Sequence, residues 1–136
     1  MSRESGLPRP RHLYLRGGRG AVLPGPARAR LAAMQAAGDQ PAISDLTWRE
    51  CRVKPIRLGD AVALADMEAF LTGSDVVRVA MATGGYERAC RIRAIHSYKL
   101  ADSLHLAAAV EGGCGLFLTN DHRLSGFPDM PVEVLP

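Results

Sequence analysis

The chain has 136 residues, 47% of them hydrophobic and only 5% aromatic, and its formal net charge is +3 at pH 7. This length suits one domain with a sizeable core, and the absence of an apolar run of about 18 residues excludes a membrane-spanning helix. The three cysteines, Cys51, Cys90 and Cys114, lack the spacing of a zinc site, and the first residues lack the apolar stretch of a secretory signal. We therefore expect a cytoplasmic protein with reduced thiols.

The N-terminal part of the chain is strongly basic. Residues 1–30 hold seven arginines against one acid, Glu4, which gives this part a net charge of +6 and leaves −3 for the remainder. A basic arm can favour nucleic acid by counterion release, whereas a solvated tail is the simpler interpretation of the charge alone. Residues 1–11 are expected to form a disordered tail, and residues 12–136 one domain whose first part, 12–25, is atypical.

The rest of the sequence alternates short strands with helices. Strands are predicted at residues 12–15, 41–46, 75–79, 116–118 and 132–135, and helices at residues 26–37, 47–55, 61–71, 85–97 and 102–111. Two helices follow the second strand, two follow the third, and no internal repeat or linker divides the chain. This order predicts the α/β class, with a central and mainly parallel sheet flanked by helices.

Three acidic residues stand at the ends of predicted elements. Glu50 follows the second strand by four residues, Asp102 opens a largely apolar helix, and Asp121 lies just past the fourth strand. Each also has a purely structural explanation. Glu50 can complete a capping box begun by Thr47, and the two aspartates can serve as a helix N-cap and in an Asx-turn.

Taken together, the three acids can share one edge of the sheet, because the carboxyl ends of parallel strands meet there. Clustered carboxylates repel one another and need a cation, and hard oxygen donors suit Mg²⁺ or Mn²⁺. Such an ion can generate hydroxide and neutralise the charge that develops on a phosphodiester. The histidines show no metal-ligand spacing, and His105 is interpreted as a packed helix residue.

Three motifs at these separations carry a family resemblance. They read Ser44-Asp-Leu-Thr-x-x-Glu50, Asp102-Ser-Leu-His-Leu-Ala-Ala-Ala109 and Phe117-Leu-Thr-Asn-Asp121-x-x-Leu124. Over roughly residues 26–136 the chain resembles the PIN domain, which is Rossmann-like, and most of all the VapC-type toxins of bacterial type II toxin–antitoxin pairs.

The resemblance implies a specific activity and specific partners. It implies an endoribonuclease that cleaves RNA with Mg²⁺ or Mn²⁺, and it maps the catalytic and metal-binding acids onto Glu50, Asp102 and Asp121. It further implies a cognate antitoxin protein as inhibitor and, commonly, a homodimer. Thr119 and Asn120, just before the last acid, are expected to orient the site by hydrogen bonds.

The first predicted strand departs from the PIN pattern. The family carries an acid at the end of this strand, but here Leu15 is followed by Arg16 and no carboxylate occurs between Glu4 and Asp39. Exchanging −1 for +1 at about 6 Å from a divalent ion opposes its binding by several kcal/mol, at an effective dielectric constant of about 20. The glycines that follow fit neither phosphate-loop spacing, which disfavours nucleotide binding.

Two functions therefore stay open from the sequence. In the first, the protein is a metal-dependent ribonuclease and toxin, impaired by the loss of the first acid. In the second, it is a catalytically inactive PIN-like module that binds an antitoxin or RNA. The composition of residues 16–25, rich in Gly and Arg, also fits a shifted reading frame in the gene of an otherwise ordinary toxin.

Overall fold

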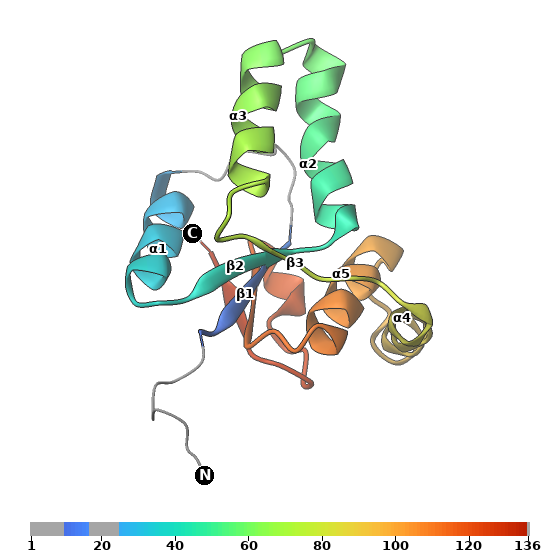
Figure 1. Cartoon of the computed structure of the whole chain (residues 1–136). Helices are drawn as coiled ribbons and strands as arrows, with labels where there is room; N and C mark the ends of the chain where they lie inside the picture. Colours follow the sequence, from blue (N-terminus) through green and yellow to red (C-terminus); the bar gives the residue numbers. More distant parts are fainter. Residues whose placement is uncertain (1–9, 17–24, 136) are drawn as a thin grey trace.

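The protein is built around a parallel sheet of five strands in the order β3-β2-β1-β4-β5 (Figure 1). The computed structural model describes residues 10–16 and 25–135. The strands are β1 (His12–Leu15), β2 (Gln40–Ile43), β3 (Val77–Arg78), β4 (Leu116–Thr119) and β5 (Val132–Val134). The helices are α1 (Gly25–Ala36), α2 (Asp45–Leu58), α3 (Ala61–Leu71), α4 (Thr83–His96), α5 (Leu100–Glu111) and the short 3-10 helix η1 (His122–Leu124). The predicted α/β class and order of elements are confirmed.

The side chains of β1 divide the core into two parts. Leu13 and Leu15 point to one face of the sheet, where they pack with buried residues of α1, α2 and α3. Tyr14 points to the other face and packs with residues of α4 and α5. This alternation is the two-residue period of a strand, and it makes the domain a sheet between two layers of helices.

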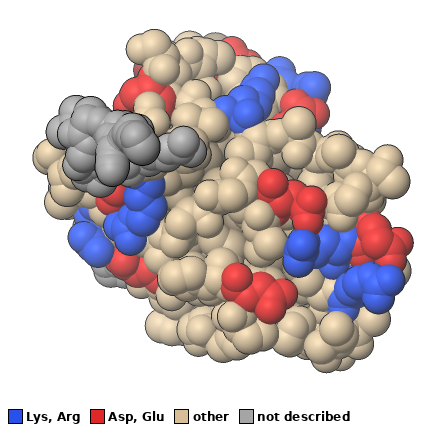
Figure 2. Space-filling view, turned by 60° about the horizontal axis from the view of Figure 1, so that its bottom comes forward, with Lys and Arg blue, Asp and Glu red and all other residues tan. Residues whose placement is uncertain are grey.

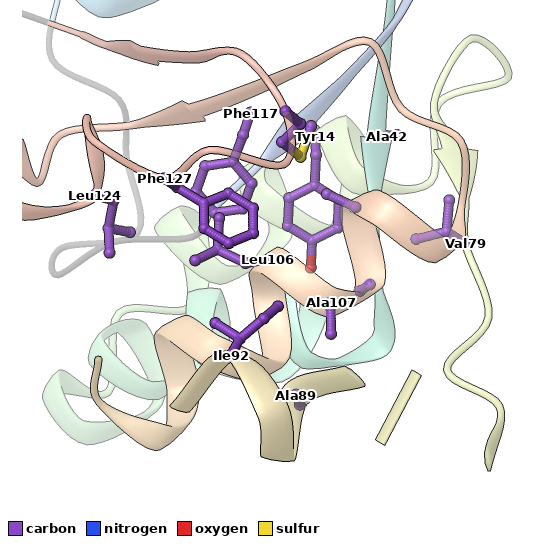
Figure 3. Close-up of a cluster of buried hydrophobic side chains, with 13 residues drawn as sticks. Tyr14, Ala42, Val79, Ala89, Ile92, Leu106, Ala107, Phe117, Leu124 and Phe127 are labelled. Carbon is purple, nitrogen blue, oxygen red and sulfur yellow. The ribbon is translucent and has the colours of Figure 1, made fainter. Parts of the chain in front are cut away.

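The part of the core around Tyr14 contains α5, the helix that the sequence predicts to be buried. Residues Leu106, Ala107 and Ala109 of α5 have no exposed surface, which confirms this prediction. Figure 3 shows Tyr14 and Phe117 gathered with the apolar residues of this cluster, and their rings stack with centroids 5.4 Å apart. The close packing fixes the start of α5 relative to the carboxyl edge of the sheet.

The start of α2 differs from the prediction. β2 ends at Ile43, and Ser44 caps a helix that begins two residues earlier than expected. The Ser44 Oγ accepts a hydrogen bond from the Thr47 backbone N–H at 3.4 Å, and the Thr47 Oγ1 accepts one from the Ser44 N–H at 3.3 Å. The predicted capping box of Thr47 and Glu50 is therefore wrong, because Thr47 is the third residue of the helix rather than its cap.

Other element ends also differ. α2 continues through Pro55 to Leu58, and Gly59 caps its end in the left-handed conformation (φ 66°). α5 begins at Leu100, so Asp102 lies in its first turn and is not the N-cap. The third strand is shorter than predicted, with two residues, and at the opposite edge β5 has three.

Several expectations from composition can be compared with the structure. Cys51, Cys90 and Cys114 are free thiols. No helix in the described part of the chain has the length and apolar character needed to cross a bilayer. The predicted N-terminal tail lies outside the described residues apart from Pro10 and Arg11, and so does most of the stretch after Arg16.

An ion pair fastens α1 to the edge strand β5 and predicts a pH dependence. The Arg30 Nε and Nη2 donate to the two carboxylate oxygens of Glu133 at 2.7 and 3.0 Å. The Arg30 hydrogen bonds hold the pKa of Glu133 below its ordinary value. The ion pair therefore stabilises the folded state fully at a pH above the ordinary pKa of a glutamate, and this stabilisation is lost as the pH falls through the lowered pKa of Glu133.

We expect Arg30→Ala to lower stability in urea unfolding at pH 7, and the difference from wild type to shrink as the pH is lowered towards 3. Salt should weaken the difference at pH 7, because both side chains are partly exposed. A difference that is the same at pH 7 and pH 3 would show that Arg30 acts by packing and not by charge.

Candidate functional site

The carboxyl ends of three neighbouring strands form one edge of the sheet. Arg16 follows β1, Ser44 follows β2 and Thr119 ends β4. The backbone N–H of Arg16 donates to the Leu118 carbonyl at 3.0 Å, so the sheet ladder extends to this residue and fixes its position. Side chains that leave the sheet here start from a rigid base.

Arg16 joins two of the predicted site residues. Its Nε donates to the Asp102 Oδ1 at 3.0 Å, and its Nη1 donates to the Glu50 Oε1 at 2.6 Å. The side chains are partly withdrawn from water, with 19% of Arg16, 26% of Glu50 and 6% of Asp102 exposed. The structure thus brings Glu50 and Asp102 together at one guanidinium, although they are distant in sequence.

A buried polar chain holds Glu50 from the other side. The His105 Nε2 lies 2.8 Å from the Glu50 Oε1, and the His105 Nδ1 lies 2.7 Å from the Tyr14 hydroxyl. That hydroxyl is in turn 2.7 Å from the Ser44 Oγ. His105 is indeed packed, with no exposed surface, but it also contacts the site, which the sequence interpretation missed. The available signal was its spacing, since a residue three positions after Asp102 lies on the same side of a helix.

The proton positions in this series of hydrogen bonds can be assigned because the Glu50 carboxylate can only accept. Burial lowers the pKa of His105, which favours the neutral ring, and a carboxylate can only accept, so the Nε2–H donates to Glu50. The Nδ1 then accepts from the Tyr14 hydroxyl, and the Tyr14 oxygen accepts from the Ser44 hydroxyl. All of the hydrogen bonds in the chain therefore run in one direction, towards Glu50.

Burial and neighbouring groups at the site shift two further pKa values, those of Glu50 and Tyr14. Burial alone raises the pKa of Glu50, but the hydrogen bond from His105 and the positive charge of Arg16 outweigh it and hold this pKa below its ordinary value. Burial raises the pKa of Tyr14 to about 12. Glu50 is thus a carboxylate and Tyr14 a neutral donor at physiological pH.

Asp121 lies on the same edge, after β4. Its Oδ1 accepts a hydrogen bond from the Arg123 N–H at 2.9 Å, and its Oδ2 pairs with the Arg123 Nη2 at 2.7 Å. The hydrogen bonds from Arg123 lower the pKa of Asp121 to about 2. The Thr119 Oγ1 accepts from the Asp121 N–H at 3.0 Å, which supports the turn, whereas Asn120 is exposed and no hydrogen bond of its side chain is found in the described residues.

As placed, these residues do not fit a divalent cation. Among residues 10–16 and 25–135, no group of three or more His, Cys, Asp and Glu side chains is arranged to hold a metal ion. The Glu50 Oε1 already accepts from both Arg16 and His105, and the Asp102 Oδ1 accepts from Arg16. One hard oxygen atom of each of these two carboxylates, of the kind that Mg²⁺ or Mn²⁺ needs, is thus engaged by the guanidinium.

Known structures of toxin–antitoxin proteins have a similar fold. VapBC2 from Rickettsia felis, bound to a DNA fragment from the promoter, matches with a TM-score of 0.72 at 14% identity, over 92% of this chain and 99% of that chain. A toxin–antitoxin complex from Klebsiella pneumoniae matches with a TM-score of 0.62 at 24% identity, over 79% and 83%. VapC20 from Mycobacterium tuberculosis, a toxin that cleaves the sarcin–ricin loop, matches with a TM-score of 0.62 at 17% identity, over 88% and 98%.

Sequence comparison gives the family. No curated protein matches the chain significantly. The family model of the PIN domain, in contrast, matches residues 13–130, which include the sheet edge and all three predicted acids. The chain therefore belongs to the PIN domain family.

Proposed function

We propose that this chain is the toxin-type member of a toxin–antitoxin pair, with an endoribonuclease site outlined by Glu50, Asp102 and Asp121 and impaired by Arg16. Membership of the PIN domain family supports the ribonuclease assignment. The fold similarity to a toxin that cleaves the sarcin–ricin loop, and to proteins solved as VapBC complexes, supports the toxin assignment. The free cysteines are consistent with a cytoplasmic location.

The observation that carries the proposal is the double ion pair of Arg16. It shows two acids of the predicted site converging on one positive group at the carboxyl edge of the sheet, where α/β proteins bind their ligands. The same contact favours impaired cleavage, since the Mg²⁺ or Mn²⁺ implied by the family resemblance needs oxygen atoms that Arg16 engages. RNA binding at this edge is compatible with the charges, because Arg16 and Arg123 offset the repulsion that bare carboxylates would exert on phosphates.

The surface supports a protein partner more clearly than an extended RNA contact. On the face shown in Figure 2, acidic and basic side chains lie beside one another and form no broad basic area.

Helices α2 and α3, which project together from the sheet in Figure 1, expose large apolar side chains. These are Val53, Ile56, Leu58, Val62 and Phe70. We assign this exposed apolar surface to an antitoxin; a second copy of the chain is the other candidate, and measuring the mass of the purified chain in solution separates the two.

An RNA cleavage assay tests the proposed activity. With Mn²⁺ or Mg²⁺ present, wild-type protein is expected to leave a structured RNA nearly intact, and Arg16→Asp is expected to cleave it at least about 100-fold faster. The gain follows from replacing a positive charge by the acid that the family carries at the end of the first strand. Adding Asp102→Asn to Arg16→Asp should abolish the cleavage, as should excess EDTA.

Two results would contradict parts of the proposal. Wild-type cleavage as fast as that of Arg16→Asp, and lost in Asp102→Asn, would show an active enzyme that Arg16 does not impair. A folded Arg16→Asp variant that never cleaves RNA would favour the inactive binding module instead.

A further inference from the structure

We infer that Arg16 is the resident cation of this acidic site: its guanidinium occupies the place of a divalent ion, so the folded protein neither needs nor binds one there. The inference rests on the proposed function only in taking Glu50 and Asp102 as the site. It concerns which cation these carboxylates hold, and not whether RNA is cleaved.

The first argument is the choice of atoms. Arg16 uses two different nitrogens for two different acids, the Nη1 for the Glu50 Oε1 at 2.6 Å and the Nε for the Asp102 Oδ1 at 3.0 Å. A metal ion shared by these acids would need the same carboxylate oxygen atoms as ligands. The two cations are therefore mutually exclusive at these oxygen atoms.

The second argument is burial. The Asp102 side chain is only 6% exposed and that of Glu50 26%, so neither carboxylate is fully solvated. Two partly buried like charges side by side destabilise a fold unless a positive group lies between them. In the described residues, Arg16 is the group seen to contact both.

The third argument is that the sheet fixes the backbone of Arg16. Its backbone N–H is bonded to Leu118, so the residue extends the central strand and does not start from a free loop. Because the backbone of Arg16 is already fixed, only its side chain has to be ordered on pairing, and a metal ion in solution must displace the guanidinium before binding. The competition therefore favours the internal cation at ordinary metal concentrations.

Thermal unfolding with Mn²⁺ as the probe tests this inference on the full chain. The melting temperature of wild type is expected to stay within about 1 °C between excess EDTA and 1 mM Mn²⁺, because no site is open. Arg16→Ala should melt lower than wild type in EDTA and recover by at least about 5 °C in 1 mM Mn²⁺. Calorimetric titration should show Mn²⁺ binding to Arg16→Ala and none to wild type.

Arg11→Ala is the matched control. Arg11 lies just before β1, at the opposite end of the same strand, and pairs with Asp39 at 2.9 Å. This variant also removes one arginine from an ion pair, but it should respond to Mn²⁺ no more than wild type does. Arg16→Gln, which keeps a polar side chain, replaces Arg16→Ala if that variant does not fold.

The outcomes separate this inference from the proposed function. Stabilisation of wild type by Mn²⁺ equal to that of Arg16→Ala would overturn the inference, and so would the absence of any response in both Arg16 variants. A Mn²⁺ response confined to the Arg16 variants upholds it, even if no variant cleaves RNA and the ribonuclease proposal fails.

Discussion

Replacing Phe117 by alanine is expected to lower the free energy of unfolding by about 3–5 kcal/mol. Phe117 lies in the central region of the sheet, has no exposed surface and stacks on Tyr14 with ring centroids 5.4 Å apart. The neighbouring strands and α5 cannot close around the cavity, because they are held by the sheet ladder and by close helix packing. Urea unfolding followed by circular dichroism measures the loss.

Phe70→Ala provides the control for this prediction. Phe70 lies on α3 and is 42% exposed, so the same change of residue should cost about 1 kcal/mol or less. Equal losses for the two variants would mean that the cluster around Phe117 is not the principal core of the domain.

Tyr14→Phe is expected to lower the free energy of unfolding by about 2–3 kcal/mol, although it removes a single oxygen atom. The Tyr14 hydroxyl lies 2.7 Å from both the His105 Nδ1 and the Ser44 Oγ in a region without water access. Its loss leaves a buried nitrogen acceptor without a donor. The chemical shifts of the His105 ring nitrogens, measured by NMR, should report a wild-type ring protonated at Nε2 and a changed ring state in the variant.

Tyr86→Phe is the matched change at the surface. Tyr86 lies on α4 and is 58% exposed, so removing its hydroxyl should change stability by about 0.5 kcal/mol at most. If Tyr14→Phe were as mild as this control and left the His105 signals unchanged, the directed chain of hydrogen bonds towards Glu50 would be wrong.

The number, type and order of the elements could be predicted because the core is regular. Buried strands such as β1 and β4 are short apolar runs, and α5 is apolar around most of its circumference. These patterns arise because the sheet is buried between two layers of helices, so that its strands and α5 must be apolar on most of their surface. Such apolar runs can be recognised in a single sequence. The parallel arrangement followed from the helices between successive strands.

The boundaries were harder to predict, because several residues satisfy the same local rule. Thr47 has the residue type and spacing for a cap three residues before Glu50, and Ser44 has them three residues before Thr47. The choice depends on where β2 ends, since Ser44 is the first residue past the strand and its side chain also reaches Tyr14. That contact joins residues 30 positions apart, and no local pattern reports it.

The same limit applies to the site. Topology predicts the convergence of Glu50, Asp102 and Asp121, and the structure joins Glu50 and Asp102 through Arg16, whereas Asp121 pairs with Arg123. The sequence alone already shows that an arginine follows β1 where the family carries an acid. The distances that make Arg16 a bridge, and the hydrogen bond from His105, depend on side-chain positions across three elements. The role of Asp121 as a metal-binding residue stays a prediction, and its turn-forming role is seen directly in the hydrogen bond that its Oδ1 accepts from the Arg123 backbone N–H.

The brevity of β3 and β5 has a consequence for how copies of this protein meet. Outermost strands with two and three residues expose too few unpaired backbone groups to template a strand from another molecule. Growth of the sheet from molecule to molecule, the first step towards fibrils, is thereby disfavoured at both borders. Within the described part of the chain, contacts between folded copies through these two edge strands are therefore expected to be short-lived.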